Sequence, residues 1–101
     1  MTTTYKVIFR PKAKKRFDKL DTAVQRQLAR KLDERRRNPR VPGDALSHMP
    51  NCYKIKLRAR GIRMIYQVQD EIVLLLVLAV GGRENEDAYI EAARELASLD
   101  D

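Results

Sequence analysis

The alternation of hydrophobic and polar positions divides the chain into seven segments of regular structure. Alternation of period two predicts strands at 5–9, 52–58 and 62–69, and the apolar run 72–80 predicts a strand buried on both faces. Apolar positions at helical spacing predict helices from Pro11 to about residue 20, from Thr22 to 37, and from Asn85 onward. Asp21 and Asn85 are expected to cap helices, Asn38-Pro39 ends the second one, and Gly81-Gly82 ends the last strand.

The resulting order is β-α-α-β-β-β-α, with short connections apart from a loop at 39–50 that is rich in Pro and Gly. We expect one domain of the α/β (α+β) class over residues 1–101, with an antiparallel sheet and helices packed on one of its faces. The strand 72–80 should be central. The pattern leaves the register of the hairpin around 58–62 open: an even-length loop puts Arg63 on the face of Lys54, Lys56 and Arg58, and an odd loop or a bulge puts it on the other.

Charge is unevenly distributed along this pattern. The chain carries a formal charge of +7, yet residues 1–83 hold 20 basic and 7 acidic residues, whereas residues 84–101 hold one basic and 7 acidic residues. A cationic body of this kind indicates an acidic partner such as nucleic acid, because Lys and Arg gain affinity at phosphates by releasing counterions.

Several classes of protein are disfavoured by the same sequence. The single cysteine, Cys52, excludes an internal disulfide and fits a reducing cytoplasm. No signal segment is visible, and the nine-residue run 72–80 is too short for a helix that spans a bilayer. One His, His48, with one Cys and no spaced carboxylates predicts neither a metal site nor a bound cofactor. We therefore expect a soluble cytoplasmic domain.

The segment 53–63 carries the candidate chemistry, because its exposed positions are almost all cationic. Lys54, Lys56, Arg63, Arg83 and Tyr89 form a set that suits cleavage of an RNA phosphodiester. Guanidinium groups match phosphate oxygens, a lysine surrounded by cations has a lowered pKa and can take a proton, and a tyrosine can stack on a base. The alternative is a solvated basic strand face that only binds, with Tyr89 as a core aromatic of the last helix.

Three segments and one further residue resemble the RelE toxins of bacterial toxin–antitoxin systems: 49–58, 61–68, 80–84, and Tyr89. The resemblance extends over nearly the whole chain. It implies the toxin of a type II toxin–antitoxin system, an endoribonuclease that enters the ribosomal A site and cuts mRNA there without metal. The position of Lys56 would be the general base, Lys54 would contact phosphate, and Arg63 would stabilise the transition state. Arg83 would stabilise it too and protonate the leaving oxygen, while Tyr89 would orient or stack the substrate.

The same resemblance implies partners. They are a cognate, RelB-like antitoxin that is acidic or amphipathic, the ribosome with its 16S rRNA, and mRNA; the toxin–antitoxin complex would bind operator DNA through the antitoxin. The chain departs from its relatives at Ser47 and His48, where an Arg and a Gly are usual, and at Asn85, where a basic residue is usual. These departures affect possible RNA contacts and leave codon preference open.

A second group of basic residues is expected to contact rRNA or mRNA through phosphates: Lys12, Lys14, Lys15, Arg16, Arg35, Arg36, Arg37, Arg58 and Arg60. Two other functions remain open. One is a ParE-like relative that poisons DNA gyrase without nuclease activity, which the presence of all five candidate catalytic residues disfavours. The other is a plain nucleic-acid-binding module, in which removing charges would lower affinity smoothly.

Overall fold

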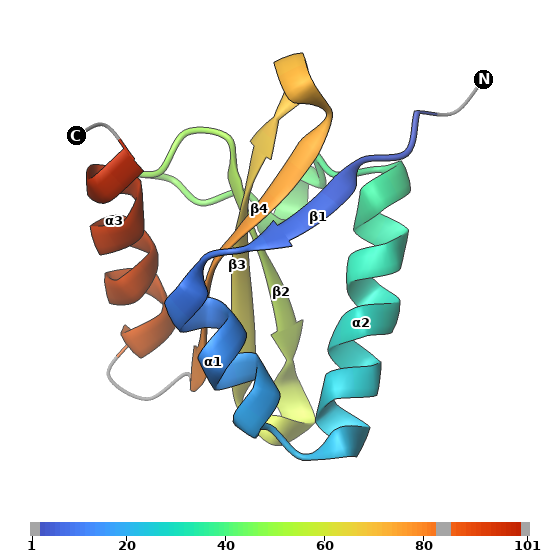
Figure 1. Ribbon diagram of the computed structural model, residues 1–101, viewed down its shortest axis with the longest axis vertical. Helices are drawn as coiled ribbons and strands as arrows, with labels where there is room; N and C mark the ends of the chain where they lie inside the picture. The colour runs from blue at the N-terminus through green and yellow to red at the C-terminus, as the bar shows by residue number, and fades with distance from the viewer. Residues whose placement is uncertain (1–2, 83–85, 100–101) are drawn as a thin grey trace.

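The computed structural model describes residues 3–82 and 86–99 of the chain (Figure 1). The order of elements is the predicted one. The elements are β1 (Lys6–Phe9), α1 (Pro11–Lys19), α2 (Thr22–Arg37), β2 (Cys52–Leu57), β3 (Ile62–Gln69), β4 (Leu74–Gly82) and α3 (Asp87–Leu99), with 3-10 turns at Pro42–Asp44, Arg58–Arg60 and Asp70–Ile72. The predicted capping by Asp21 is confirmed, because its carboxylate accepts a hydrogen bond of 2.8 Å from the backbone N–H of Ala23. The expected cap Asn85 lies outside the described residues.

The four strands form one mixed sheet in the order β1-β4-β3-β2. β2, β3 and β4 pair antiparallel, whereas β1 lies at the edge and runs parallel to β4. The expectation of a wholly antiparallel sheet is therefore wrong for this one pair. The reason is the two-helix excursion: the backbone N–H of Tyr5, just before β1, donates to the carbonyl of Arg36 at the end of α2. The chain thus returns to the end where β1 began, and β2 and β4 run in the same direction as β1.

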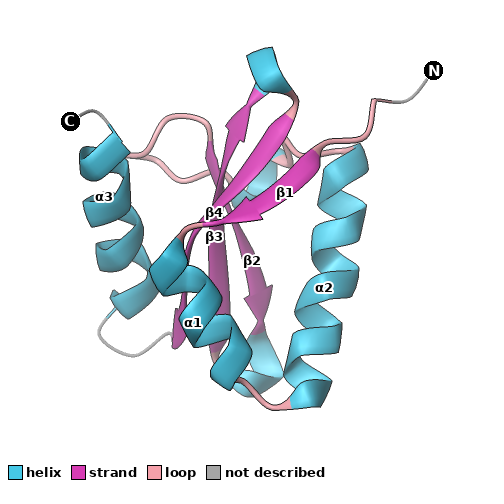
Figure 2. Cartoon of the chain, in the orientation of Figure 1, coloured by secondary structure: helices cyan, strands magenta, loops and turns pink. Residues whose placement is uncertain are grey.

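Helices cover both faces of the sheet, which corrects the expectation of helices on one face (Figures 1 and 2). On one face, Val24, Leu28 and Leu32 of α2 pack in one buried cluster with side chains of every strand. On the other face, Ala88 and Ala92 of α3 pack in a second cluster. β4 is central and buried along nearly its whole length, as its uninterrupted apolar sequence predicts, because a strand without a polar face needs cover on both sides.

The hairpin register, left open by the sequence, is set by a four-residue turn. Lys56 pairs with Arg63 and Leu57 with Ile62, so residues 58–61 form the connection. Gly61 closes it with φ of 64°, in the left-handed region that glycine adopts without strain. Since directly paired residues project on the same side of a sheet, Lys56 and Arg63 share a face, the one that α3 covers.

Within residues 3–82 and 86–99, no helix combines the length and the apolar character that crossing a bilayer requires.

Candidate functional site

A hollow of about 540 Å³ lies where the hairpin, the loop after Pro42–Asp44 and the start of α3 meet. We call it the cationic hollow. Four of the five predicted catalytic residues line it: Lys54 and Lys56 from β2, Arg63 from β3 and Tyr89 from α3. The remaining lining residues are Ala45, Leu46, Ser47, His48, Met49 and Glu86. The fifth predicted residue, Arg83, lies outside the described residues, so its place in the site stays a prediction.

The alternation of β2 explains why both lysines reach this hollow. Ile55 and Leu57 are buried in the cluster under α2, and the alternate positions, Lys54 and Lys56, project to the other face of the sheet. Both lysines are half-buried. Their stems therefore lie against the sheet while their ammonium groups meet at the hollow.

The electrostatic environment lowers the pKa of Lys56. The largest cause is the neighbouring charge of Lys54, followed by partial desolvation and by the charges of Arg58 and Arg63. A like charge disfavours the protonated form of an amine. The neutral amine of Lys56, which is the form able to accept a proton, is thereby more populated at a given pH than in an isolated lysine.

Arg63 lies against the ring of Tyr89. The guanidinium carbon is 5.2 Å from the ring centroid, within the range of a cation–π contact. The two residues come from different elements and are half-buried, so the ring fixes the direction of a charge that would otherwise be mobile. Tyr89 is thus neither a plain core aromatic nor a free surface residue: it forms one wall of the hollow.

The 45–49 loop contributes to the hollow two of the positions at which the sequence is expected to depart from the RelE toxins. Ser47 and His48 both line the hollow, and both are exposed. The resemblance singled out these two positions, but their place beside Lys54 and Arg63 depends on how the 45–49 loop folds over the strand.

Cys52 is not part of the site. It is 1% exposed, and burial raises the pKa of its thiol to about 11. A thiol that remains protonated at neutral pH is a poor nucleophile. Within the described part of the chain, no three His, Cys, Asp or Glu side chains gather as a metal site would require.

Arg35 is largely buried by contacts within the protein, and the RNA contact expected for it stays a prediction. Its guanidinium donates to the Tyr66 hydroxyl at 3.0 Å and to the Lys54 carbonyl at 3.2 Å, and it pairs with Asp44. Only 15% of its side chain is exposed. The physical reason is that the end of α2 lies beside Lys54 of β2 and Tyr66 of β3. The Arg35 side chain therefore points inward and links the helix to the strand that carries Lys54.

The other predicted binding residues lie on the surface. Arg36, with an additional bond to the Tyr5 carbonyl, and Arg37 both pair with Asp33. Lys12 pairs with Glu91 and Arg60 with Asp21 at longer distances, and Lys14 pairs with Asp18 one turn along α1. Lys15, Arg16 and Arg58 are exposed. Exposed ion pairs of this kind contribute little, so most of these cations can exchange a carboxylate for a phosphate.

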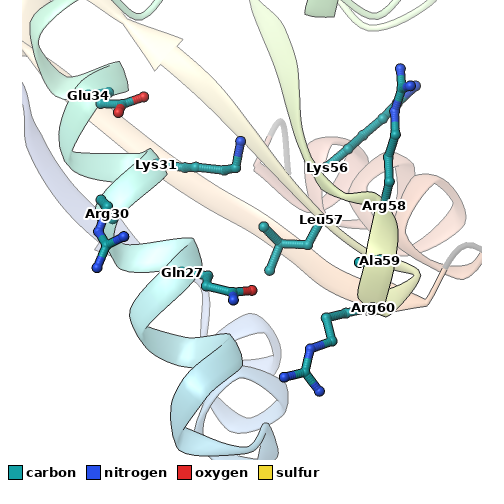
Figure 3. Close-up of a pocket in the computed structure, with 9 residues that line it drawn as sticks. All are labelled: Gln27, Arg30, Lys31, Glu34, Lys56, Leu57, Arg58, Ala59 and Arg60. Atoms are coloured by element: carbon teal, nitrogen blue, oxygen red, sulfur yellow. The ribbon is translucent and has the colours of Figure 1, made fainter.

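The sequence analysis did not single out two basic residues of α2. Arg30 and Lys31 of α2 line a second hollow of about 580 Å³, and Lys31 extends from the helix toward the hairpin (Figure 3). Their position on the helix, off the buried stripe of Val24, Leu28 and Leu32, indicates only that they are exposed. Nothing in the sequence shows that they line one groove together with Arg58 and Arg60.

Chemically, the cationic hollow is suited to an anion with several oxygen atoms. It offers two ammonium groups and a guanidinium in a fixed direction, one of the amines has a lowered pKa, and an aromatic ring stands beside them. These are the components needed to bind a phosphodiester, withdraw a proton and stabilise charge on the phosphoryl oxygens.

Comparison with known proteins gives one consistent result. A family model described as ParE toxin of type II toxin–antitoxin system, parDE, matches residues 7–86. A putative RelE-like toxin protein of Escherichia coli is 47% identical over 92 residues, covering 91% of this chain and 97% of the relative. The mRNA interferase toxin RelE of E. coli strain K12 is 44% identical with the same coverage.

Solved structures agree with these sequence relatives. A mutant of E. coli toxin RelE in the free state superposes with a TM-score of 0.86 at 42% identity, covering 92% of this chain and 98% of that one. RelE in the intact E. coli RelBE toxin–antitoxin complex superposes with a TM-score of 0.78 at 44% identity, covering 80% and 99%.

Proposed function

Because the chain belongs to the RelE/ParE family of toxins from type II toxin–antitoxin systems, we propose that it is an mRNA interferase, a toxin that inhibits translation by cutting mRNA in the ribosomal A site. The observation that carries the proposal is the convergence of Lys54, Lys56, Arg63 and Tyr89 on one hollow. A basic surface that only binds RNA needs charge, but it needs neither a lysine with a lowered pKa nor an arginine oriented by an aromatic ring.

The proposed reaction is an internal transfer that requires no metal. Lys56 removes the proton of the 2′-hydroxyl, and the 2′-oxygen attacks the adjacent phosphorus. Lys54 and Arg63 stabilise the charge that develops on the phosphoryl oxygens. The bond between phosphorus and the 5′-oxygen breaks, and that oxygen takes up a proton. We assign the donation of this proton to Arg83. The products are a 2′,3′-cyclic phosphate or its opened form and a 5′-hydroxyl end.

The partners follow from the family and from the charge. Relatives are solved with the RelB antitoxin, and we propose a RelB-like antitoxin for this toxin. It would be acidic or amphipathic, to complement a chain with a formal charge of +7, and would carry the complex to operator DNA. The 16S rRNA around the A site would meet the exposed cations of α1 and of the hairpin turn, and a reaction on the ribosome would take place in the cytoplasm.

A gyrase poison is the second candidate, because the matching family model is named for ParE. Such a toxin would bind its target without cutting RNA. The retained lysine pair and the Arg63–Tyr89 contact favour the nuclease, since neither is needed for binding alone.

The experiment combines three assays: cleavage of mRNA on programmed ribosomes, cleavage of the same mRNA free in solution, and inhibition of DNA gyrase acting on supercoiled plasmid. We expect cleavage on the ribosome only. Lys56→Ala should slow the cleavage by about 100-fold or more, the usual contribution of a general base, while the matched control Lys19→Ala on the exposed end of α1 should cut normally. Intact mRNA together with inhibited gyrase would refute the proposal.

Independence of metal is tested separately. We expect cleavage to persist in EDTA at a concentration that leaves the ribosomes assembled. Loss of cleavage there would refute the lysine–arginine mechanism while leaving the nuclease itself in place.

A further inference from the structure

The second hollow is a groove between α2 and the β2–β3 hairpin, which we call the hairpin groove (Figure 3). Its residues are Gln27, Arg30, Lys31 and Glu34 from α2, Lys56 and Leu57 from β2, and Arg58, Ala59 and Arg60 from the turn. Five of these side chains are cationic and one, Glu34, is anionic. Figure 3 shows Lys31 extending from the helix toward the hairpin, whereas the ends of Lys56 and Arg58 lie close together in this view, on the side away from α2.

Most of this positive charge has no carboxylate beside it. Within residues 3–82 and 86–99, the structure gives Arg30, Lys31, Lys56 and Arg58 no ion pair. Arg60 reaches Asp21 only at 3.7 Å, and both side chains are largely exposed. The groove therefore maintains a positive potential that a polyanion can neutralise with little competition from the protein itself.

The hairpin groove and the cationic hollow are contiguous. Lys56 lines both, and Arg58, in the groove, is one of the charges that act on Lys56. A chain that leaves the hollow past Lys56 therefore enters the groove without crossing an uncharged surface.

We propose that the RNA strand being cut continues from the cationic hollow over Lys56 and Arg58 into the hairpin groove, where Arg30 and Lys31 bind its phosphates. This inference rests on the proposed nuclease function and adds a second binding site for the substrate. Arg30 and Lys31 are binding residues here, outside the reacting centre.

The chemistry of the groove favours RNA over a peptide. An amphipathic helix docks through an apolar stripe, but the only apolar residues here are Leu57, which is 7% exposed, and Ala59. The exposed large apolar side chains lie elsewhere: Ile8, Ile72, Ile90 and Leu99. Binding of phosphates requires charge rather than apolar area.

The test uses the double variant Arg30→Gln/Lys31→Gln and a matched control, Lys19→Gln/Arg26→Gln. The control removes the same charge from exposed residues outside the groove. A charge-conserving variant, Arg30→Lys/Lys31→Arg, completes the set. Binding of a labelled RNA trinucleotide and of a dodecamer, both 2′-O-methylated so that they cannot be cut, is measured by fluorescence anisotropy over a range of KCl concentrations.

We expect the groove variant to lose affinity for the dodecamer alone. Two lost phosphate contacts lower the slope of log K against log salt by about 1.4, and the affinity in 0.1 M salt by roughly 25-fold. The control and the charge-conserving variant should bind the dodecamer with an affinity close to that of wild type. The trinucleotide, which fits in the hollow, should bind all the proteins with the same affinity.

Three results would overturn the inference: an equal loss in the groove variant and the control, an equal loss for both RNA lengths, or normal RNA binding with lost affinity for an acidic antitoxin peptide. Cleavage on programmed ribosomes distinguishes a failure of the groove assignment from a failure of the proposed nuclease function. If wild type cuts and the groove variant still binds the dodecamer like the control, only the groove assignment falls. If wild type does not cut, the proposed function falls, and this inference falls with it.

Discussion

Substitution of Tyr66 by phenylalanine removes one oxygen from the interior of the molecule and tests how the site is supported. Tyr66 is fully buried, its hydroxyl donates to the carbonyl of Pro39 at 2.6 Å, and it accepts from Arg35 at 3.0 Å. Burial raises the pKa of Tyr66, so the hydroxyl keeps its proton and remains a donor. Arg35 in turn holds the backbone of Lys54, which links this hydroxyl to the strand of the site.

The expected cost follows from these two bonds. Phenylalanine leaves the buried Pro39 carbonyl without its partner and takes one acceptor from Arg35, whose other bonds to Lys54 and Asp44 remain. An unsatisfied buried group costs about 1–3 kcal/mol, so we expect the free energy of unfolding to fall by about that amount. For a domain of this size, the melting temperature should fall by about 4–8 °C for each kcal/mol.

Urea unfolding followed by circular dichroism measures the change, and its slope m should equal that of wild type because the surface exposed on unfolding is unchanged. Tyr5→Phe is the matched control: its hydroxyl bonds to Asp70 at 2.6 Å in an exposed position, where water can replace the lost partner, so little change is expected. The reasoning is refuted if Tyr66→Phe unfolds like wild type, or if the control is equally destabilised.

Three further outcomes follow from the structure. Tyr89→Phe keeps the ring under Arg63 and should cleave mRNA more nearly like wild type than Tyr89→Leu; equal loss in both would instead assign the role to the hydroxyl. Lys54→Met removes the largest cause of the lowered pKa of Lys56, so that pKa rises and the ascending limb of the single-turnover pH–rate profile should move to higher pH; an unchanged or acidic-shifted limb would exclude Lys56 as the base. Cys52, buried with a pKa raised to about 11, should react with iodoacetamide at pH 8 far more slowly in the folded protein than in urea, as mass spectrometry would show; equal rates would contradict its burial.

Local patterns predicted the elements well because helix and strand periodicity is a property of neighbouring residues. The boundaries of β3 at 62–69 agree with the prediction, and β2 ends one residue early because Arg58 begins the 3-10 turn. β4 begins at Leu74 rather than residue 72, since Ile72 belongs to the preceding turn, and it continues to Gly82 because Gly82 pairs with Ile62. Pairing between strands, which a single segment does not contain, decides such ends.

For the candidate site, too, some residues follow from local pattern and others do not. Lys54 and Lys56 follow from strand alternation alone, whereas choosing Arg63 and Tyr89 required the resemblance to RelE toxins. The contact between them joins α3 to β3, elements separated by a complete strand. Arg35 is the opposite case: charge at the end of a helix predicted an exposed cation, and the packing of that helix against β2 turned it inward.

By itself, the sequence determined the order of the elements, the doubly buried β4, the cationic face of β2 and the family resemblance, because each of these is carried by residue type and short-range spacing. The tertiary structure alone decided that β1 runs parallel to β4, that α3 covers the face opposite α2, that a four-residue turn brings Arg63 beside Lys56, and that Arg30 and Lys31 line one groove with the hairpin turn. These features depend on strand register and on the direction in which segments return to one another. Such long-range relations are fixed by burying both faces of one sheet together, and no local pattern encodes them.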